Sequence, residues 1–187
     1  MNTQLDIIIA GCKENNIHCQ EQLYKLCYPD MIKLCSRYAK DLDEAGAIYN
    51  NAMLKVFKEI IRYKEEGKFM GWVRIVTVRC CLDFIKTTTR FKTIKIELIE
   101  SEVVFTDVEI ISGIAVNEIR KIISELPKAT STVFNLFAYE GFTHKQIAEL
   151  LGISEGTSKW HVNDARRILK QRLLPLLTDE IEVNAAG

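Results

Sequence analysis

The chain has 187 residues, which is enough for one good-sized hydrophobic core or for two small ones. Apolar residues make up 48% and charged residues 27%, a composition that is ordinary for a folded globular protein and argues against disorder over most of the length. No apolar run approaches the ~20 residues of a membrane-spanning helix, and the first residues lack the features of a signal peptide. The sequence therefore predicts a cytoplasmic protein.

The net charge is formally zero, with 25 basic and 25 acidic residues, so the overall field does not attract nucleic acid. The distribution along the chain is uneven. Residues 71–92 carry five basic side chains against one acidic, and residues 158–172 again carry five against one. Residues 93–109 carry five acidic side chains against one basic. Two basic segments thus flank an acidic one.

A first helical domain is predicted over residues 1–92. Apolar residues at steps of three and four predict a helix from about Gln20 to Lys40. Pro29 lies inside this helix and indicates either a kink or a break, because proline lacks the amide donor and crowds the preceding turn.

Two more helices complete this predicted domain. Asp43 has the position of an N-cap for a helix from Glu44 to roughly Tyr63. The next helix is expected over residues 68–86, starting near Phe69, with apolar and basic residues on different faces. Its outer face is therefore predicted to be basic.

Residues 93–113 are the predicted connection between two domains. Their sequence is rich in β-branched residues and partly alternating, which by propensity alone indicates a strand. A lone strand has no partner for its edges. We therefore interpret this segment as a flexible acidic linker.

The helical period resumes at about Val116 and predicts a second domain over residues 114–177. Pro127 has the position that opens a helix, where a missing amide costs nothing, and Gly141 has the position that ends one. The tail, residues 178–187, is expected to fray. The predicted fold class is thus all-α, with two small helical domains.

Residues 141–173 have the pattern of a helix-turn-helix. Thr143 and Gln146 have capping-box spacing, which predicts that a helix starts at Thr143. Gly152 permits a sharp turn, and Ser154 can cap a second helix. A helical hairpin with a glycine turn is also a common structural unit, but a cap, a turn and a basic second helix in one short window favour DNA binding.

The second helix of this motif has a predicted buried face and a predicted DNA face. Ser158, Val162, Ala165 and Leu169 share one side, so the polar and aromatic residues must point the other way. Basic side chains there suit phosphates, and His161 and Asn163 suit base edges. The candidate DNA-binding residues are Thr157, Lys159, Trp160, His161, Asn163, Asp164, Arg166 and Arg167.

Six cysteines, at positions 12, 19, 27, 35, 80 and 81, include no Cys-x-x-Cys pair and lie mostly within apolar stripes. Reduced core thiols are therefore expected. A metal site at Cys12, His18 and Cys19, or redox sensing by Cys80 and Cys81, is the less favoured alternative.

An enzyme needs a nucleophile or an acid–base set. The three histidines, His18, His144 and His161, are scattered and have no partner pattern of that kind. We expect no enzyme activity, no metal, no cofactor and no small-molecule substrate.

A resemblance to a known family covers most of the chain, about residues 20–92 and 114–174. The stretch ELPKATSTVFNLFAYEGFTHKQIAELLGISEGTSKWHVNDARRIL has a leucine-proline opening, an EG turn, an IAE and LGIS core and a GT-K start. The N-terminal half contains LYKLCYPDMIKLCSRYAKD, AMLKVFKEI and KFMGWVRIVTVRCCLDFIK. In this order they resemble regions 4 and 2 of bacterial sigma factors of the extracytoplasmic-function class. The resemblance implies a factor that binds core RNA polymerase and directs transcription initiation at the minus-ten and minus-thirty-five elements of promoter DNA.

The resemblance also implies roles for residues of the first domain. The helix from Glu44 to Ile60 would dock on the polymerase clamp, and the loop and helix from Tyr63 to Arg90 would capture the opened minus-ten strand. Single-stranded bases stack on aromatic rings in a basic groove. For Trp72, core packing is equally favoured, whereas Phe69 precedes the helix and is freer. The candidates are Tyr49, Asn50, Asn51, Leu54 and Lys55 for polymerase, and Lys68, Phe69, Trp72, Arg74 and Arg79 for the minus-ten strand.

In the second domain, the resemblance implies that the recognition helix reads the minus-thirty-five element, and an anti-sigma factor is an expected partner. The acidic linker would thread toward the polymerase active-site channel. Some residues depart from the family pattern. Asn50 and Asn51 stand where Gln and Glu are usual, and Asp164 stands where a basic residue is frequent, although Asp can accept a hydrogen bond from cytosine.

A stand-alone helix-turn-helix regulator is the alternative interpretation. In that case the first domain serves sensing or dimerisation, and the chain binds duplex DNA without polymerase. The zero net charge instead favours weak DNA binding by the chain alone.

Overall fold

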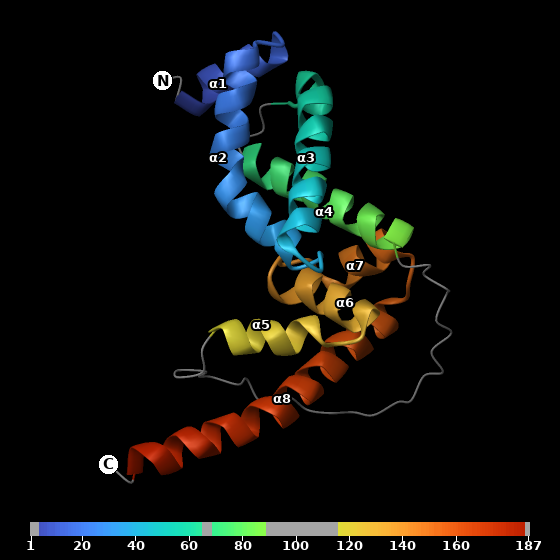
Figure 1. The fold of residues 1–187 in the computed structure, drawn as a ribbon. Helices are drawn as coiled ribbons and strands as arrows, with labels where there is room; N and C mark the ends of the chain where they lie inside the picture. Colours follow the sequence, from blue (N-terminus) through green and yellow to red (C-terminus); the bar gives the residue numbers. More distant parts are fainter. Residues whose placement is uncertain (1–3, 65–68, 89–115, 186–187) are drawn as a thin grey trace. The chain divides into compact units, whose positions relative to one another are not determined.

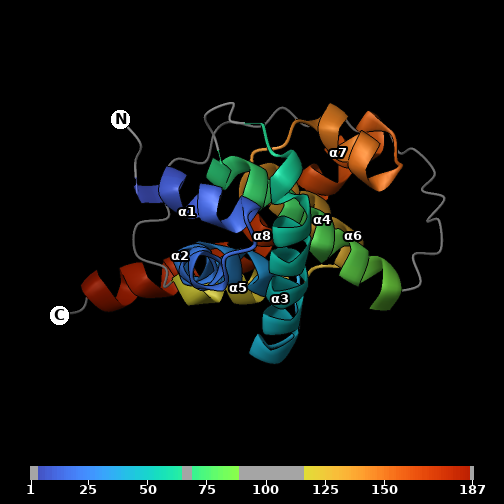
Figure 2. The same cartoon turned by 90° about the horizontal axis from the view of Figure 1, so that it is seen from above.

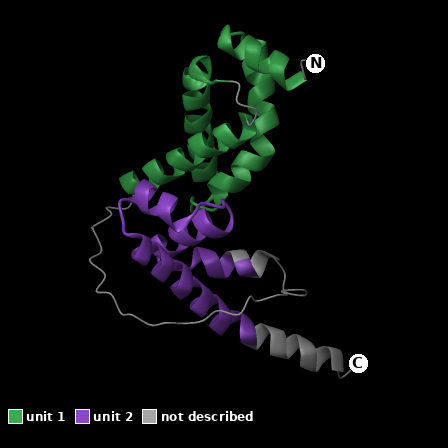
Figure 3. Ribbon diagram, turned by 180° about the vertical axis from the view of Figure 1, so that it is seen from behind, with its two compact units in different colours: residues 1–93 green, residues 94–187 purple. Residues whose placement is uncertain are grey.

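A computed structural model describes residues 4–64, 69–88 and 116–185. These residues form α-helices and one 3-10 helix, and none of them is in a strand (Figure 1). The predicted all-α fold class is therefore confirmed. The chain divides into two compact units, residues 1–93 and residues 94–187 (Figure 3). The linker predicted at residues 93–113 lies outside the described residues.

Unit 1 contains α1 (Gln4–Lys13), α2 (Ile17–Ser36), α3 (Leu42–Glu59), η1 (Ile60–Arg62) and α4 (Phe69–Thr88). Helices α2, α3 and α4 pack against one another, and α1 packs against α2 and η1 (Figure 2). The sequence analysis singled out no helix at α1, because its buried side chains, Ile8, Ile9 and Cys12, make only a short stripe.

The core of unit 1 is built mainly from the apolar stripes that the sequence predicted. Buried side chains recur along α2 mainly at steps of three and four residues, and α3 contributes a second buried stripe. Leu26 of α2 is apolar but 49% exposed, so it lies outside this stripe. The buried residues of these two stripes include Leu23, Cys27, Met31 and Leu34 on α2 and Ile48, Met53 and Val56 on α3.

Helix α2 differs from its prediction at both ends and at its proline. The helix begins at Ile17, because Asn16 caps it by accepting the Cys19 N–H at 3.2 Å. It ends at Ser36, and Pro29 lies inside one continuous helix, so the predicted alternative of a break is wrong.

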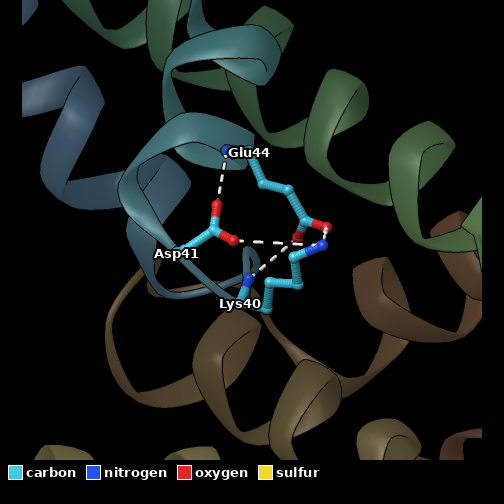
Figure 4. Close-up of polar contacts among 3 residues, drawn as sticks. All are labelled: Lys40, Asp41 and Glu44. Atoms are coloured by element: carbon cyan, nitrogen blue, oxygen red, sulfur yellow. Dashed lines mark hydrogen bonds and ion pairs between the residues drawn. The ribbon is translucent and has the colours of Figure 1, made fainter.

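The start of α3 corrects a second prediction, that Asp43 is the cap. Asp41 is the N-cap instead, because its backbone is extended and its carboxylate accepts the Glu44 N–H at 2.8 Å. Glu44 in turn accepts the backbone N–H of Lys40 at 2.9 Å and pairs with the Lys40 ammonium at 2.9 Å (Figure 4). Helix α3 ends at Glu59 and continues as η1, so it is shorter than the predicted span to Tyr63.

Unit 2 contains α5 (Val116–Ser124), α6 (Lys128–Ala138), α7 (His144–Leu151) and α8 (Glu155–Ala185). Helix α8 packs against the other three. Its Ala165 shares a buried cluster with Ile123 and Leu126, and its Arg172 pairs with Glu125. Helix α8 extends to Ala185, beyond the residue 178 from which the tail was expected to fray.

The cysteines of unit 1 are free thiols, and five of the six are buried. Burial raises the pKa of Cys12 to about 11 and that of Cys27 to about 12. These two thiols are therefore protonated at neutral pH. Within the described ranges, no group of three or more His, Cys, Asp or Glu side chains has the arrangement of a metal site. Among the same residues, no helix has the length and apolar character needed to cross a membrane.

Candidate nucleic-acid and polymerase interfaces

The helix-turn-helix predicted from the sequence is present in unit 2. The Gln146 N–H donates to the Thr143 hydroxyl at 3.3 Å, and the Thr143 N–H donates to Gln146 Oε1 at 2.9 Å, which completes the capping box. Gly152 has φ of +69°, the left-handed conformation that permits the turn. Ser154 then accepts the Thr157 N–H at 2.9 Å and caps α8.

The side of α8 that helical spacing predicted to be buried faces the interior of unit 2. Ser158, Val162 and Ala165 are buried, and Leu169 is half-buried. The Ser158 hydroxyl lies 3.0 Å from Nδ1 of His144, which joins α8 to α7. The burial of this side orients the opposite side of α8 toward solvent.

His161 corrects the predicted assignment to base edges. Its side chain is only 5% exposed, and its Nδ1 lies 3.0 Å from the Thr130 hydroxyl on α6. Burial lowers the pKa of His161, although Asp164 acts in the opposite direction. His161 therefore holds α8 to α6 and is not available to a DNA groove.

The outward side of α8 carries the remaining predicted DNA contacts, which we call the recognition face. Trp160 is 36% exposed, and its ring meets the His161 ring edge-on at 4.9 Å. Asn163 is half-buried, and its amide makes no hydrogen bond to the described residues. The recognition face consists of Thr157, Lys159, Trp160, Asn163, Asp164, Arg166 and Arg167.

Asp164 has an internal partner on this face. Its Oδ1 lies 2.7 Å from the Arg167 guanidinium, and its side chain is mostly shielded from solvent. Arg167 also donates to Gln171 at 3.3 Å. Asp164 thus holds Arg167 in place, and this pairing competes with the direct cytosine contact that the sequence suggested.

A stack of rings and charges beside the recognition face was missed by the sequence analysis. The His144 ring lies parallel to Phe137 at 4.7 Å, and the Arg166 guanidinium lies 5.8 Å from the Phe137 ring centre. Burial lowers the pKa of His144, and the charges of Lys159 and Arg166 lower it further. These residues come from three helices, so no periodic pattern in the sequence could connect them.

In unit 1, three rings form an aromatic cluster where η1 and α4 meet. The Tyr63 ring lies 5.1 Å from the rings of both Phe69 and Trp72, and those two rings are 5.6 Å apart. Phe69 begins α4 and is buried, so the expectation that it precedes the helix and is free is wrong. Trp72 and Tyr63 are half-buried. Lys68 lies outside the described residues.

The basic residues predicted on α4 differ in exposure. Arg79 is exposed, and Arg74 is half-buried. Both lie on the helix that contributes Trp72 to the aromatic cluster. The aromatic rings and the positive charges expected for a single-strand site are therefore on one element.

Helix α3 presents four of the five predicted polymerase contacts to solvent, and one of these four, Lys55, is paired with α4. Asn50 and Asn51 are exposed, and Leu54 is 66% exposed, as is Leu42, at 75%, at the start of the same helix. We call Asn50, Asn51 and Leu54 the polymerase face. Ile61, on η1, is also exposed and was not among the predicted contacts.

The two predicted polymerase contacts outside the polymerase face are engaged within unit 1. Tyr49 is fully buried and donates its hydroxyl to the carbonyl of Tyr24 at 2.6 Å, which corrects its assignment as a contact. Lys55 pairs with Asp83 of α4 at 3.0 Å, and this hydrogen bond raises the pKa of Lys55. Lys55 thus ties α3 to α4.

Comparison with known proteins agrees with this architecture. The model of Sigma-70 region 2 matches residues 23–91, and the model of Sigma-70 region 4 matches residues 117–169. Among solved structures, the chain is similar to the sigma factor RpoE in complex with the anti-sigma factor NepR from Bartonella quintana. The two are 17% identical with a TM-score of 0.54, and the similarity covers 82% of this chain and 95% of that one. No curated protein matches this chain.

The chain belongs to the sigma-70 family, with region 2 in unit 1 and region 4 in unit 2. This two-domain layout is that of the extracytoplasmic-function class. The chain is thus a sigma factor, a transcription initiation factor that binds core RNA polymerase and directs it to promoter DNA.

Proposed function

We propose that the recognition face of α8 reads the minus-thirty-five element as duplex DNA. One observation carries this proposal: Trp160 and Asn163 are accessible on one side of α8 while the other side is buried against unit 2. The Asn163 amide can bond to a base edge, and the exposed cations Lys159 and Arg166 can contact phosphates. Asp164 acts through Arg167, by fixing its guanidinium beside the groove.

For the minus-ten element, we propose that an unpaired base stacks on the aromatic cluster of unit 1. Trp72 and Tyr63 are the half-buried rings, and buried Phe69 supports them from below the surface. Arg79, on the same helix as Trp72, supplies positive charge for the strand backbone, together with Arg74.

Polymerase binding is proposed to use the polymerase face of α3. Leu54 offers apolar area at its centre, and Asn50 and Asn51 offer hydrogen bonds one turn earlier. Because RNA polymerase works in the cytoplasm, we propose that the chain acts there. Its role is to bind and position and not to catalyse a reaction, and it takes no small-molecule substrate or cofactor.

An anti-sigma factor is a further proposed partner. The similar sigma factor from Bartonella quintana was solved in complex with its anti-sigma factor NepR, and the chain covers nearly all of that protein. We expect affinity purification of the tagged chain from unstressed cells to recover such a protein. Recovery of polymerase alone, in stressed and unstressed cells alike, would contradict this proposal.

Two substitutions on α8 test how the recognition face reads DNA. Lys159→Ala should weaken binding of the sigma–polymerase complex to all promoters by a similar factor, because a phosphate contact carries no sequence information. Asn163→Ala should change the order of preference among minus-thirty-five variants, because a base-edge contact discriminates by about 1–3 kcal/mol. The measurement is competitive binding to a set of duplexes that differ at single positions.

Lys33→Ala is the matched control, because Lys33 is an exposed lysine on α2 in unit 1. It should leave both the affinity and the order of preference unchanged. An Asn163→Ala variant that weakens all duplexes equally would show that α8 does not read base edges through Asn163.

A further inference from the structure

Three tyrosines from α2 and α3 form a cluster next to the polymerase face. The Tyr24 ring lies 4.8 Å from the Tyr49 ring and 6.5 Å from the Tyr28 ring, and the Tyr28 and Tyr49 rings are 5.3 Å apart. Tyr49 is fully buried, Tyr24 is half-buried and Tyr28 is 46% exposed. The cluster thus runs from the core of unit 1 to its surface.

Tyr24 is fixed at both ends in this cluster. Its backbone carbonyl accepts the hydroxyl of buried Tyr49 at 2.6 Å. Its own hydroxyl donates to Oδ1 of Asn50 at 2.7 Å, across the contact between α2 and α3. A ring packed against two others and bonded at its tip has little rotational freedom, so it can hold a neighbouring side chain in one orientation.

The bond from Tyr24 determines what Asn50 can offer to a partner. An asparagine amide has one oxygen that accepts and one NH2 group that donates twice. One of the two lone pairs of the oxygen accepts from the Tyr24 hydroxyl, whereas the NH2 group makes no hydrogen bond to any residue that the structure describes. Asn50 is exposed, and the bond from Tyr24 fixes the direction in which its two N–H donors point.

We propose that Tyr24 is a positioning residue for polymerase binding, which orients Asn50 so that its NH2 group donates to a carbonyl or carboxylate oxygen on core RNA polymerase. The inference rests on the proposed role of the polymerase face. It adds a residue of α2, outside the helix that makes the contact, and it specifies the chemistry of the polymerase group that is recognised. A freely rotating amide loses rotational entropy when it forms the bond, and an amide that is already held in place loses less. Orientation by Tyr24 should therefore strengthen binding.

The test is the affinity of the full chain for core RNA polymerase, measured with a fluorescent label on the chain. Asn50→Ala should weaken binding by roughly threefold to tenfold if the polymerase group is a neutral carbonyl, and by more if it is a carboxylate. Tyr24→Phe removes only the hydroxyl and should weaken binding measurably, by no more than Asn50→Ala does. Because both variants disturb one interaction, the double variant should bind no more weakly than Asn50→Ala alone.

Two further variants separate positioning from a general structural effect. Asn50→Asp keeps an oxygen for the Tyr24 hydroxyl but presents no N–H group, so it should lose as much affinity as Asn50→Ala. Tyr28→Phe removes a hydroxyl that has no hydrogen bond within the described part of the chain, so it should bind as the parent does. A Tyr24→Phe variant with parental affinity, or losses that multiply in the double variant, would overturn the role of Tyr24.

The polymerase face itself is checked separately with Leu54→Glu, which places a charge on its exposed apolar side chain. This variant should weaken binding far more than any of the tyrosine variants. Parental affinity for Leu54→Glu would contradict the polymerase face and the role of Tyr24 together. A large loss in Leu54→Glu with no loss in Asn50→Ala would contradict only the role of Asn50 and Tyr24.

Discussion

His161 is a buried histidine whose protonation state is coupled to the folding of unit 2. Burial keeps its pKa below the ordinary value of 6.5, so the folded state disfavours the charged form. The unfolded chain takes up the proton first as the pH falls. The stabilising contribution of neutral His161 is therefore complete above about pH 6.5 and is lost progressively below it. The pKa of His144 is also lowered, mainly by burial, so the contribution of His144 to stability should also decrease as the pH falls.

His161→Asn tests this coupling, because the asparagine amide can replace Nδ1 in the bond to Thr130. The free energy of unfolding of the parent should fall between pH 7.5 and pH 5.5, and the variant should show a smaller fall from a starting value lower by about 1–3 kcal/mol. Chemical denaturation at the two pH values measures both. His18→Asn, an exposed site on α2, is the control and should keep the parental pH dependence. An equal fall in parent and His161→Asn would refute the coupling.

At the scale of single residues, the sequence predicted the faces of α8 better than the fate of each polar side chain. Helical spacing placed Ser158 and Val162 inside and Trp160 outside, as observed. His161 was assigned to DNA because polar residues are usually solvated, yet a hydroxyl on α6 satisfies it in the core. Tyr49 was assigned to polymerase binding, but it is buried as well, and the carbonyl of Tyr24 on α2 accepts its hydroxyl. The spacing of residues along one helix does not show which side chain of another helix will lie next to them.

The turn between α7 and α8 depends on one backbone conformation. Gly152 has φ of +69°, and a Cβ added there would meet no atom within 4 Å. Gly152→Ala should therefore lower the free energy of unfolding of unit 2 by about 1–2 kcal/mol through backbone strain and not through a clash. Thermal unfolding followed by circular dichroism measures this effect.

Gly46 is the matched control for this prediction, because its added Cβ also meets no atom within 4 Å but it lies inside α3, where alanine is favoured. Gly46→Ala should leave unit 1 as stable or more stable. If Gly152→Ala proved as harmless as Gly46→Ala, the left-handed turn would not be the constraint that shapes this motif.

At the scale of elements, a helix start with a capping-box pattern could be predicted from the sequence, whereas the exact residue that caps α3 could not. The Thr143 and Gln146 spacing located the start of α7 to the residue. Asp43 was predicted as the N-cap of α3, but it lies inside the helix, and Asp41, whose backbone is extended, is the cap. The tail from residue 178 was expected to fray because it is a chain terminus, and the structure assigns α8 as far as Ala185. Helix interiors were therefore predicted more reliably than helix ends.

At the scale of the whole molecule, the chain consists of two units that each have a core of their own. Unit 1 buries its stripes among α2, α3 and α4, and unit 2 packs α5, α6 and α7 against α8. The two family resemblances could be found in the sequence because each family model matches residues within one unit. The zero net charge implies that the overall field of the chain does not draw it to DNA.

A native gel shift with a promoter fragment, comparing the chain alone, core polymerase alone and the two together at one salt concentration, tests directly whether the chain acts with polymerase. We expect a sequence-specific complex only when both proteins are present, because α8 reads DNA while the rest of the affinity comes from polymerase. If the chain alone bound the fragment as tightly and as specifically as it does with polymerase, the chain would be a stand-alone DNA-binding regulator and not a sigma factor.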